Sequence, residues 1–167
     1  HLRPYIVQGV VDWNKAFECA GFKNAIQAVV ATDTMDVDGD DMHYSVLTYA
    51  ASEKANAMGP STIDPRTGEI LEADIIWWHN VQSLISEWIV VQTGAIDPRA
   101  RSLELPIELI GDAVRFVACH EVGHSLGLRH NMMASAAYPT DSLRSESFTS
   151  RVGGTSASIM DYARFNY

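Results

Sequence analysis

The sequence predicts a mixed α/β fold of the α+β kind, in which a twisted mixed sheet packs against helices. The chain has 167 residues, of which 47% are hydrophobic, and this is enough for one core of ordinary domain size. Helical and strand patterns follow one another in the order helix, strands, helices, and an irregular C-terminal part comes last. We therefore expect one sheet with an antiparallel edge strand, a backing helix and a second long helix beneath.

The first element, over residues 4–20, is predicted to be a helix. Pro4 lies near its first turn and Gly21 lies just past its end, which suits a helix start and stop. A strand over residues 5–11 is the competing interpretation. The apolar positions at helical spacing are Ile6, Val10, Trp13 or Ala16, Phe17 and Ala20.

Two strands separated by an acidic loop are expected next. Residues 25–31 are apolar and β-branched toward their end, which predicts a buried strand, and residues 43–50 predict a second strand. The acidic residues of the loop between them could form a calcium-binding site. However, Gly39 falls in the wrong register for an EF-hand, so we favour a solvated loop without calcium. Its acidic residues are Asp33, Asp36, Asp38, Asp40 and Asp41.

A hairpin is predicted over residues 57–78. Its first strand, residues 57–63, contains Gly59 and Pro60, and proline is tolerated mainly at the edge of a sheet. Residues 64–68 have the composition of a turn, and residues 70–78 return as the second strand. We therefore expect residues 57–63 to form an antiparallel edge strand.

Two helices and an irregular segment complete the chain. Residues 81–93 are predicted to be helical, and a longer helix is predicted to begin at Pro106 and to end near Leu126. Residues 131–167 are rich in Ser, Gly and Ala and are expected to be mostly irregular.

Composition excludes some functions and leaves others open. The formal net charge is −9 and Lys and Arg do not cluster, which argues against a nucleic-acid partner. No apolar run approaches the roughly 20 residues of a membrane span. No signal peptide is visible after His1, so we expect a piece of a longer protein. Cys19 and Cys119 are too few for a disulfide framework, which leaves either one bridge or two buried thiols.

The most informative segment is His120-Glu121-Val122-Gly123-His124, in the last turns of the predicted long helix. Residues four apart lie on one helical face, so His120 and His124 can direct both imidazoles at one metal ion. Glu121 lies one residue round the helix, where it can reach a water molecule without being a ligand. Cys119 and the isolated His43 and His79 are expected to be structural, with Cys119 pointing away from the metal into the core.

His130 is expected to be a third ligand because Gly127 can end the helix. Glycine adopts left-handed backbone angles without a Cβ penalty, so the chain can turn there and bring His130 back toward the metal. Three histidine ligands leave a fourth position open, as in catalytic zinc sites.

The pattern HExxHxxGxxH resembles the signature of the metzincins, a clan of zinc metallopeptidases with a zincin-like fold. Their second signature, the Met-turn, is similar to Ser158-Ile159-Met160-Asp161-Tyr162 in this chain. The resemblance implies that Met160 forms an apolar floor beneath the three imidazoles. It also implies that Tyr162 reaches the metal or the reacting carbonyl; the alternative for Tyr162 is a packing role.

Asn131, which follows the third histidine, differs from the residue found there in astacins and in many matrixins. Together with Trp13-Asn14, the Gly59-Pro60-Ser61 run and residues 64–70, the two motifs look most like Met-zincin, a bacterial family of large exported proteins. The resemblance implies a secreted, periplasmic or cell-envelope location.

The domain organisation that we expect follows from the same resemblance. The chain is expected to be a catalytic domain, residues 1–167, from a protein with further domains. Residues 1–130 would form an upper subdomain with the active-site helix, and residues 131–167 a small lower subdomain with the Met-turn. A strand before the first helix and a helix after Tyr162, both usual in metzincins, are expected to lie outside this chain.

The expected function is a zinc-dependent metalloendopeptidase acting on peptide or protein substrates, with Zn²⁺ as cofactor. Glu121 would be the general base, and the edge strand at residues 57–63 would bind an extended substrate. Two alternatives stay open: a zinc hydrolase of a non-peptide amide, and a non-catalytic peptide-binding module. The presence of Glu121 argues against the module, which would need no base.

Overall fold

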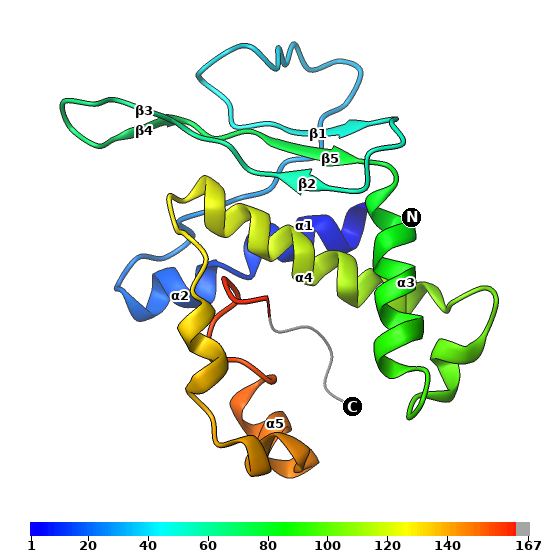
Figure 1. The fold of residues 1–167 in the computed structure, drawn as a ribbon. Helices are drawn as coiled ribbons and strands as arrows, with labels where there is room; N and C mark the ends of the chain where they lie inside the picture. The colour runs from blue at the N-terminus through cyan, green and yellow to red at the C-terminus, as the bar shows by residue number, and fades with distance from the viewer. Residues whose placement is uncertain (163–167) are drawn as a thin grey trace.

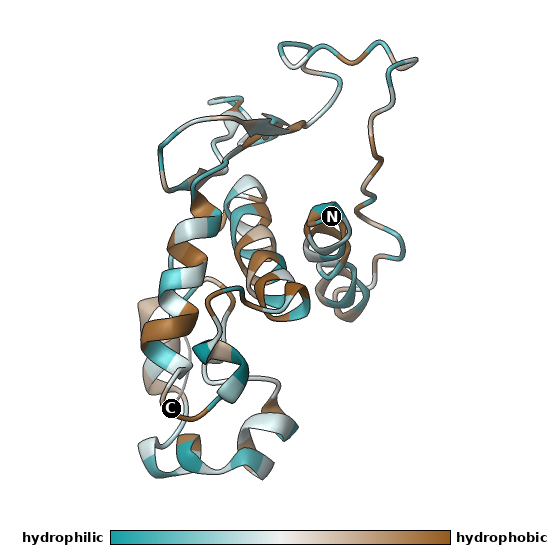
Figure 2. Cartoon of the chain, turned by 90° about the vertical axis from the view of Figure 1, so that its right-hand side faces the viewer, coloured by the Kyte–Doolittle hydropathy of each residue, from teal (hydrophilic) through white to brown (hydrophobic). Residues whose placement is uncertain are grey.

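Helix α4 (Ile107–Ser125) crosses beneath a small sheet, with α1 (Arg3–Val11) on one side of it and α3 (Val81–Thr93) on the other. This computed structural model describes residues 1–162. The three helices lie next to one another in the view of Figure 2, with the sheet above them. The mixed α/β class is thereby confirmed, and the arrangement is consistent with a zincin-like fold.

The main sheet has three strands in the order β1-β5-β2. Strand β1 (Leu47–Ala50) runs parallel to the central β5 (Ile75–Trp78), and β2 (Ala57–Met58) runs antiparallel to β5 on its other side. Ala57 is opposite Trp77 in this pairing. The prediction of an antiparallel edge strand is confirmed for β2.

The predicted hairpin forms, but each of its strands is divided in two. Strands β3 (Thr62–Ile63) and β4 (Ile70–Glu72) pair as a separate two-stranded ribbon, which extends away from the main sheet in Figure 1. The Gly59-Pro60 step separates β2 from β3, because proline has no N–H to donate to a strand partner. The hairpin turn contains Gly68, whose φ of 78° favours glycine.

The N-terminal segment is helical, so the competing strand interpretation is wrong. The helix is interrupted, however, between α1 and α2 (Asn14–Cys19). At the break the Trp13 N–H donates to Val10 O at 3.4 Å, which is three residues back rather than four. The indole N–H of Trp13 donates to Cys119 O at 2.8 Å, so the break directs this side chain toward α4.

The prediction of a buried strand at residues 25–31 is wrong. The segment carries no strand and runs along the outside of the molecule, with Val29 73% exposed. Its backbone at Ile26 bonds instead to the Asn14 amide, through both the N–H and the carbonyl. An apolar β-branched pattern does not provide a pairing partner, and none of the strands in the described residues pairs with this segment. The second predicted strand, residues 43–50, is reduced to β1.

The core lies between the underside of the sheet and helices α3 and α4. On β5, Ile75 and Trp77 are buried while the alternate residues are only partly covered, which is the period of a half-buried strand. The other buried members of the core come from β2, α3, α4 and the 3-10 helix η1 (Pro98–Arg101): Ala57, Val81, Ile85, Ile89, Ala100, Ala113, Val114 and Ala118.

The segment after α4 is less irregular than predicted. It contains the short 3-10 helices η2 (Met132–Ala136) and η3 (Thr140–Arg144), and helix α5 (Glu146–Val152). The Ser145 hydroxyl caps α5 by accepting from the Phe148 N–H. The prediction for residues 163–167, and for any helix beyond Tyr162, falls outside the described residues.

Both cysteines are free thiols, so the alternative of a disulfide is wrong. Cys119 is partly buried, as expected, but Cys19 is exposed because it ends the surface helix α2. Over the described range, the helices are either too short or too polar to cross a lipid bilayer.

Helices α1 and α4 are joined by a close contact and an ion pair. A Cβ on Gly9 would lie 2.7 Å from Arg115 O and 2.8 Å from Ala118 Cβ, so the helices approach closely at a glycine. Nearby, the Arg115 guanidinium donates two hydrogen bonds to the Asp12 carboxylate, at 2.6 and 2.8 Å. These bonds hold the pKa of Asp12 below its ordinary value.

We predict that Asp12→Asn reduces the free energy of unfolding at pH 7 by at most about 1 kcal/mol, since the pair is partly exposed. Because the folded pKa of Asp12 is depressed, its contribution is present above the unfolded pKa of about 4 and is lost as pH falls through the folded value. Urea unfolding at pH 7 and near pH 2 should therefore show the difference shrinking in acid. Asp33→Asn removes the same charge from the acidic loop and serves as the control; a pH-independent effect of Asp12→Asn would contradict the prediction.

Candidate metal centre and active site

Three histidine side chains converge beneath β2. His120 and His124 come from the last turns of α4, and His130 comes from the segment that follows it. One ring nitrogen of each lies within 4.8 Å of those of the other two, and this is the one group of its kind found in the described residues that could hold a metal ion. The Nε2 atoms of His124 and His130 are 3.0 Å apart. Two nitrogens bound tetrahedrally to zinc would be about 3.4 Å apart, so the spacing fits zinc with little adjustment.

Backbone carbonyls fix which nitrogen faces the centre. The Nδ1 atom of His120 bonds to Ile159 O at 2.7 Å, and that of His124 bonds to Leu128 O at 2.9 Å. A carbonyl oxygen can only accept, so Nδ1 carries the proton in both rings and Nε2 carries the lone pair. Metal-ligating histidines are commonly oriented by such bonds.

The chain turns at Gly127 as predicted. Its φ is 86°, in the left-handed region. The Gly127 N–H donates to His124 O at 2.8 Å, and the Leu128 N–H donates to Gly123 O at 3.0 Å. This bond pair is a Schellman motif, which ends the helix and reverses the chain so that His130 meets the two helical histidines.

Met160 packs against the underside of α4. It is 3% exposed, and a Cβ on Gly123 would lie 2.2 Å from its sulfur, so glycine is what leaves room for the methionine. The same turn is tied to the segment after the third histidine, because Met160 O accepts from the Asn131 N–H at 2.8 Å. Because this bond uses the backbone N–H of Asn131, it does not depend on which side chain is present at position 131.

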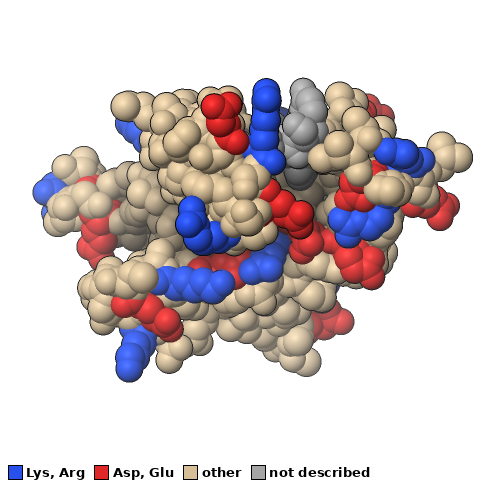
Figure 3. Space-filling model, turned by 90° about the horizontal axis from the view of Figure 1, so that it is seen from below, with Lys and Arg blue, Asp and Glu red and all other residues tan. Residues whose placement is uncertain are grey.

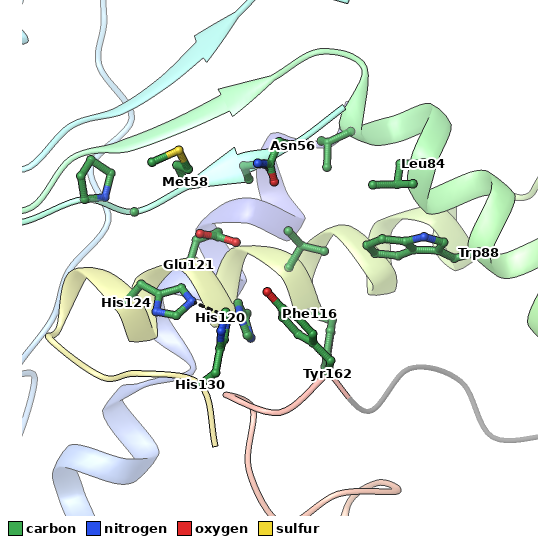
Figure 4. A pocket seen from close by; sticks show the side chains of 15 residues that line it. Asn56, Met58, Leu84, Trp88, Phe116, His120, Glu121, His124, His130 and Tyr162 are labelled. Atoms are coloured by element: carbon green, nitrogen blue, oxygen red, sulfur yellow. Dashed lines mark hydrogen bonds between the residues drawn. The ribbon is translucent and has the colours of Figure 1, made fainter. Parts of the chain in front are cut away.

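Glu121 lies between the histidines and β2, outside the ligand group. Figure 4 shows its carboxylate directed up toward the strand. Burial raises its pKa to about 7, although a hydrogen bond with the Gly59 N–H opposes the rise. The strand can approach because position 59 is glycine: a Cβ there would lie 2.6 Å from Glu121 O.

Tyr162 stands beside the third histidine. Its ring centroid is 4.4 Å from that of His130 and 5.7 Å from that of His120. The hydroxyl group points into the pocket in Figure 4, and the side chain is about half exposed. This position is compatible with the role implied by the metzincin resemblance, which stays a prediction.

The three histidines, Glu121 and Tyr162 line one pocket of about 500 Å³. Its roof is residues 56–60, and the histidines with Glu121 and Tyr162 form one end. The other end is an apolar arm that the sequence does not predict, since an apolar stripe on α3 has the same pattern whether it lines a core or a pocket. The arm is lined by Val81, Leu84, Trp88, Phe116 and Val117.

The remaining candidates lie away from this pocket. His79 bonds to the Tyr49 hydroxyl, and His43 bonds to Asp41 in the acidic loop. Cys119 does not line the pocket, and burial raises its pKa to about 11. On the face seen from below in Figure 3, Lys and Arg are dispersed among Asp and Glu rather than gathered into a basic patch.

A family model matches residues 102–167. It describes Met-zincin. The resemblance stated from the sequence is thereby confirmed for this segment, which holds α4, the third histidine and the Met-turn. A search of curated proteins and a search of solved structures each found no match. The Met-zincin match and the histidine triad together indicate a zinc or other metal ion and a function of the metallopeptidase type.

We predict that Gly127→Ala lowers the free energy of unfolding by about 1–2 kcal/mol, because left-handed angles are unfavourable for a residue with a Cβ. Gly127→Asn should lose less, since asparagine tolerates this region better. Urea unfolding of both variants measures the effect. The control is Gly39→Ala, in a loop where a Cβ meets nothing and φ is ordinary, and an equal loss there would contradict the explanation.

Proposed function

We propose that the protein is a zinc-dependent metalloendopeptidase. One observation carries the proposal: three histidine ligand atoms, a partly buried carboxylate and an open strand edge share a single pocket. The donor set suits zinc, since catalytic zinc sites use three protein ligands and keep one position open. When bound, zinc supplies Lewis-acid activation of a carbonyl group and of a water molecule.

Glu121 would act as the general base of this reaction. Its carboxylate is placed beside the histidines but is not one of the ligand group, so it can accept a proton from the attacking water and later deliver it to the leaving amine. A partly buried carboxylate suits that task because its basicity is higher than that of a solvated one. Tyr162, whose ring lies beside that of His130, would donate a hydrogen bond to the oxygen of the scissile carbonyl.

The edge strand β2 would bind the substrate backbone. One side of β2 pairs with β5, and residues 56–60 line the roof of the pocket with the other. An extended peptide can add to such an edge as a further strand. In Figure 4, β2 runs from the apolar arm toward His124, so a peptide antiparallel to it would place the residue C-terminal to the scissile bond in the arm.

The test is cleavage of a denatured protein mixture by purified protein, with and without a chelator, and with the new termini mapped by mass spectrometry. Chelator-sensitive cleavage would support the proposal. Zinc binding without any cleavage would instead favour a hydrolase of non-peptide amides or a peptide-binding module. A secreted, periplasmic or cell-envelope location, a bacterial source and further domains rest on the family resemblance and remain proposals.

We predict that Glu121→Gln retains zinc and fold but loses turnover by about 10²- to 10⁴-fold, because the amide cannot accept the proton. The glutamine oxygen can still accept from the Gly59 N–H, so the pocket should keep its shape. Peptide hydrolysis and metal analysis measure the two effects separately. His124→Ala is the companion variant, and it should lose both zinc and activity; near-normal turnover in Glu121→Gln would remove Glu121 from the mechanism.

We also predict that the mapped cleavage sites favour a large apolar residue immediately after the scissile bond. Trp88→Ala would enlarge the apolar arm and should lower the preference for Phe over Ala at that position by about tenfold, measured as the ratio of kcat/KM values. Val91→Ala changes an exposed residue of the same helix outside the pocket and is the control. Unchanged selectivity in Trp88→Ala would show that the arm does not bind the substrate side chain.

A further inference from the structure

A buried carboxylate lies in the Met-turn, between Met160 and Tyr162. Asp161 is 3% exposed, and within residues 1–162 it is the one acidic residue buried to this degree. Met160, just before it, packs beneath α4, and Tyr162, just after it, lines the pocket. Burying a carboxylate is unfavourable unless hydrogen bonds compensate for the lost hydration, so a buried carboxylate at this position indicates a specific structural role.

The Asp161 carboxylate joins three segments of the lower part of the molecule. One oxygen accepts from the hydroxyls of Ser135 in η2, at 2.5 Å, and Ser156, at 2.9 Å. The other oxygen accepts from the Tyr162 N–H at 2.7 Å. Burial alone would raise the pKa of Asp161, but these three bonds together hold it below its ordinary value, so the group is a carboxylate at neutral pH.

The turn that this carboxylate anchors supports the histidines directly. The carbonyl of Ile159 accepts the Nδ1 proton of His120 and so orients that ring. The carbonyl of Met160 accepts from the Asn131 N–H, next to the third histidine. A shift of the turn would therefore move the acceptor of one ligand and the backbone beside another.

We propose that Asp161 is a positioning residue for the metal centre: its buried carboxylate fixes the Met-turn, and the turn orients His120 and Tyr162. Asp161 does not line the pocket and is not among the three ligands, so it acts through its neighbours. The proposed effect on His120 is an effect on metal affinity and does not depend on peptidase activity. Only an effect of Asp161 on turnover would rest on the proposed peptidase function.

The test is zinc affinity, measured by competition with a chromogenic chelator, for the wild type and for variants of this hydrogen-bond group. Asp161→Ala should weaken zinc binding by about 10- to 100-fold, the usual effect of removing a group that orients a ligand. Asp161→Asn should lose less, since its oxygen can still accept from the Tyr162 N–H and its NH₂ can donate to the serines. Ser135→Ala and Ser156→Ala each remove one bond and should give smaller losses, larger when combined.

The control is Asp12→Asn, which removes a carboxylate from the α1–α4 contact and should lower the melting temperature without changing zinc affinity. If Asp161→Ala lowers the melting temperature but binds zinc like the wild type, its role is only structural and the proposal is overturned. If Asp161→Ala does not fold, zinc affinity is measured for the double variant Ser135→Ala, Ser156→Ala instead. Unchanged zinc affinity in that variant would overturn the proposal. A wild type that binds no zinc would also overturn it, whereas a wild type that binds zinc but cleaves no peptide would refute the proposed peptidase alone.

Discussion

The hydrogen bond from the Nδ1–H of His120 to the carbonyl of Ile159 links the active-site helix to the Met-turn, and the geometry of the site depends on this link. It joins a helix to a turn 39 residues further along the chain and fixes the tautomer of a ligand at the same time. Both partners need support: the helix is seated against α1, and the turn is seated by Met160 under Gly123 and by the buried carboxylate of Asp161. The orientation of one imidazole therefore depends on a turn that is far from the helix in the sequence.

Glycine at three positions allows the elements of the site to meet. Gly59 lets β2 contact α4 near Glu121, Gly123 leaves space for the methionine, and Gly127 supplies the left-handed turn that returns His130. The three glycines act in different ways: Gly59 and Gly123 leave room for close contacts, whereas Gly127 adopts backbone angles that other residues rarely adopt. Larger side chains at positions 59 and 123 would collide with α4 and with Met160, and a residue with a Cβ at position 127 would be strained, so each glycine is needed for the observed arrangement of the site.

The sequence was most informative where a local rule determines geometry. The i, i+4 histidines and the left-handed residue at Gly127 could be predicted because both depend on backbone geometry within a few residues. The prediction of a strand at residues 25–31 was wrong because a strand needs a pairing partner, which no local sequence pattern specifies. The apolar arm and the Asp161 contacts were not foreseen either: Trp88 looks like core, and a carboxylate shows its burial only when distant serines surround it.

The outer course of residues 25–31 has a consequence for the behaviour of the protein in solution. This seven-residue stretch has no charge, no proline and no glycine, and Val29 and Val30 are substantially exposed. Segments of this composition pair readily with copies of themselves and stack into cross-β assemblies. The neighbouring acidic loop, with five aspartates, places like charges beside the stretch and opposes such stacking at low ionic strength. Colloidal stability of the purified chain should therefore decline as salt is added, even while the metal centre stays intact.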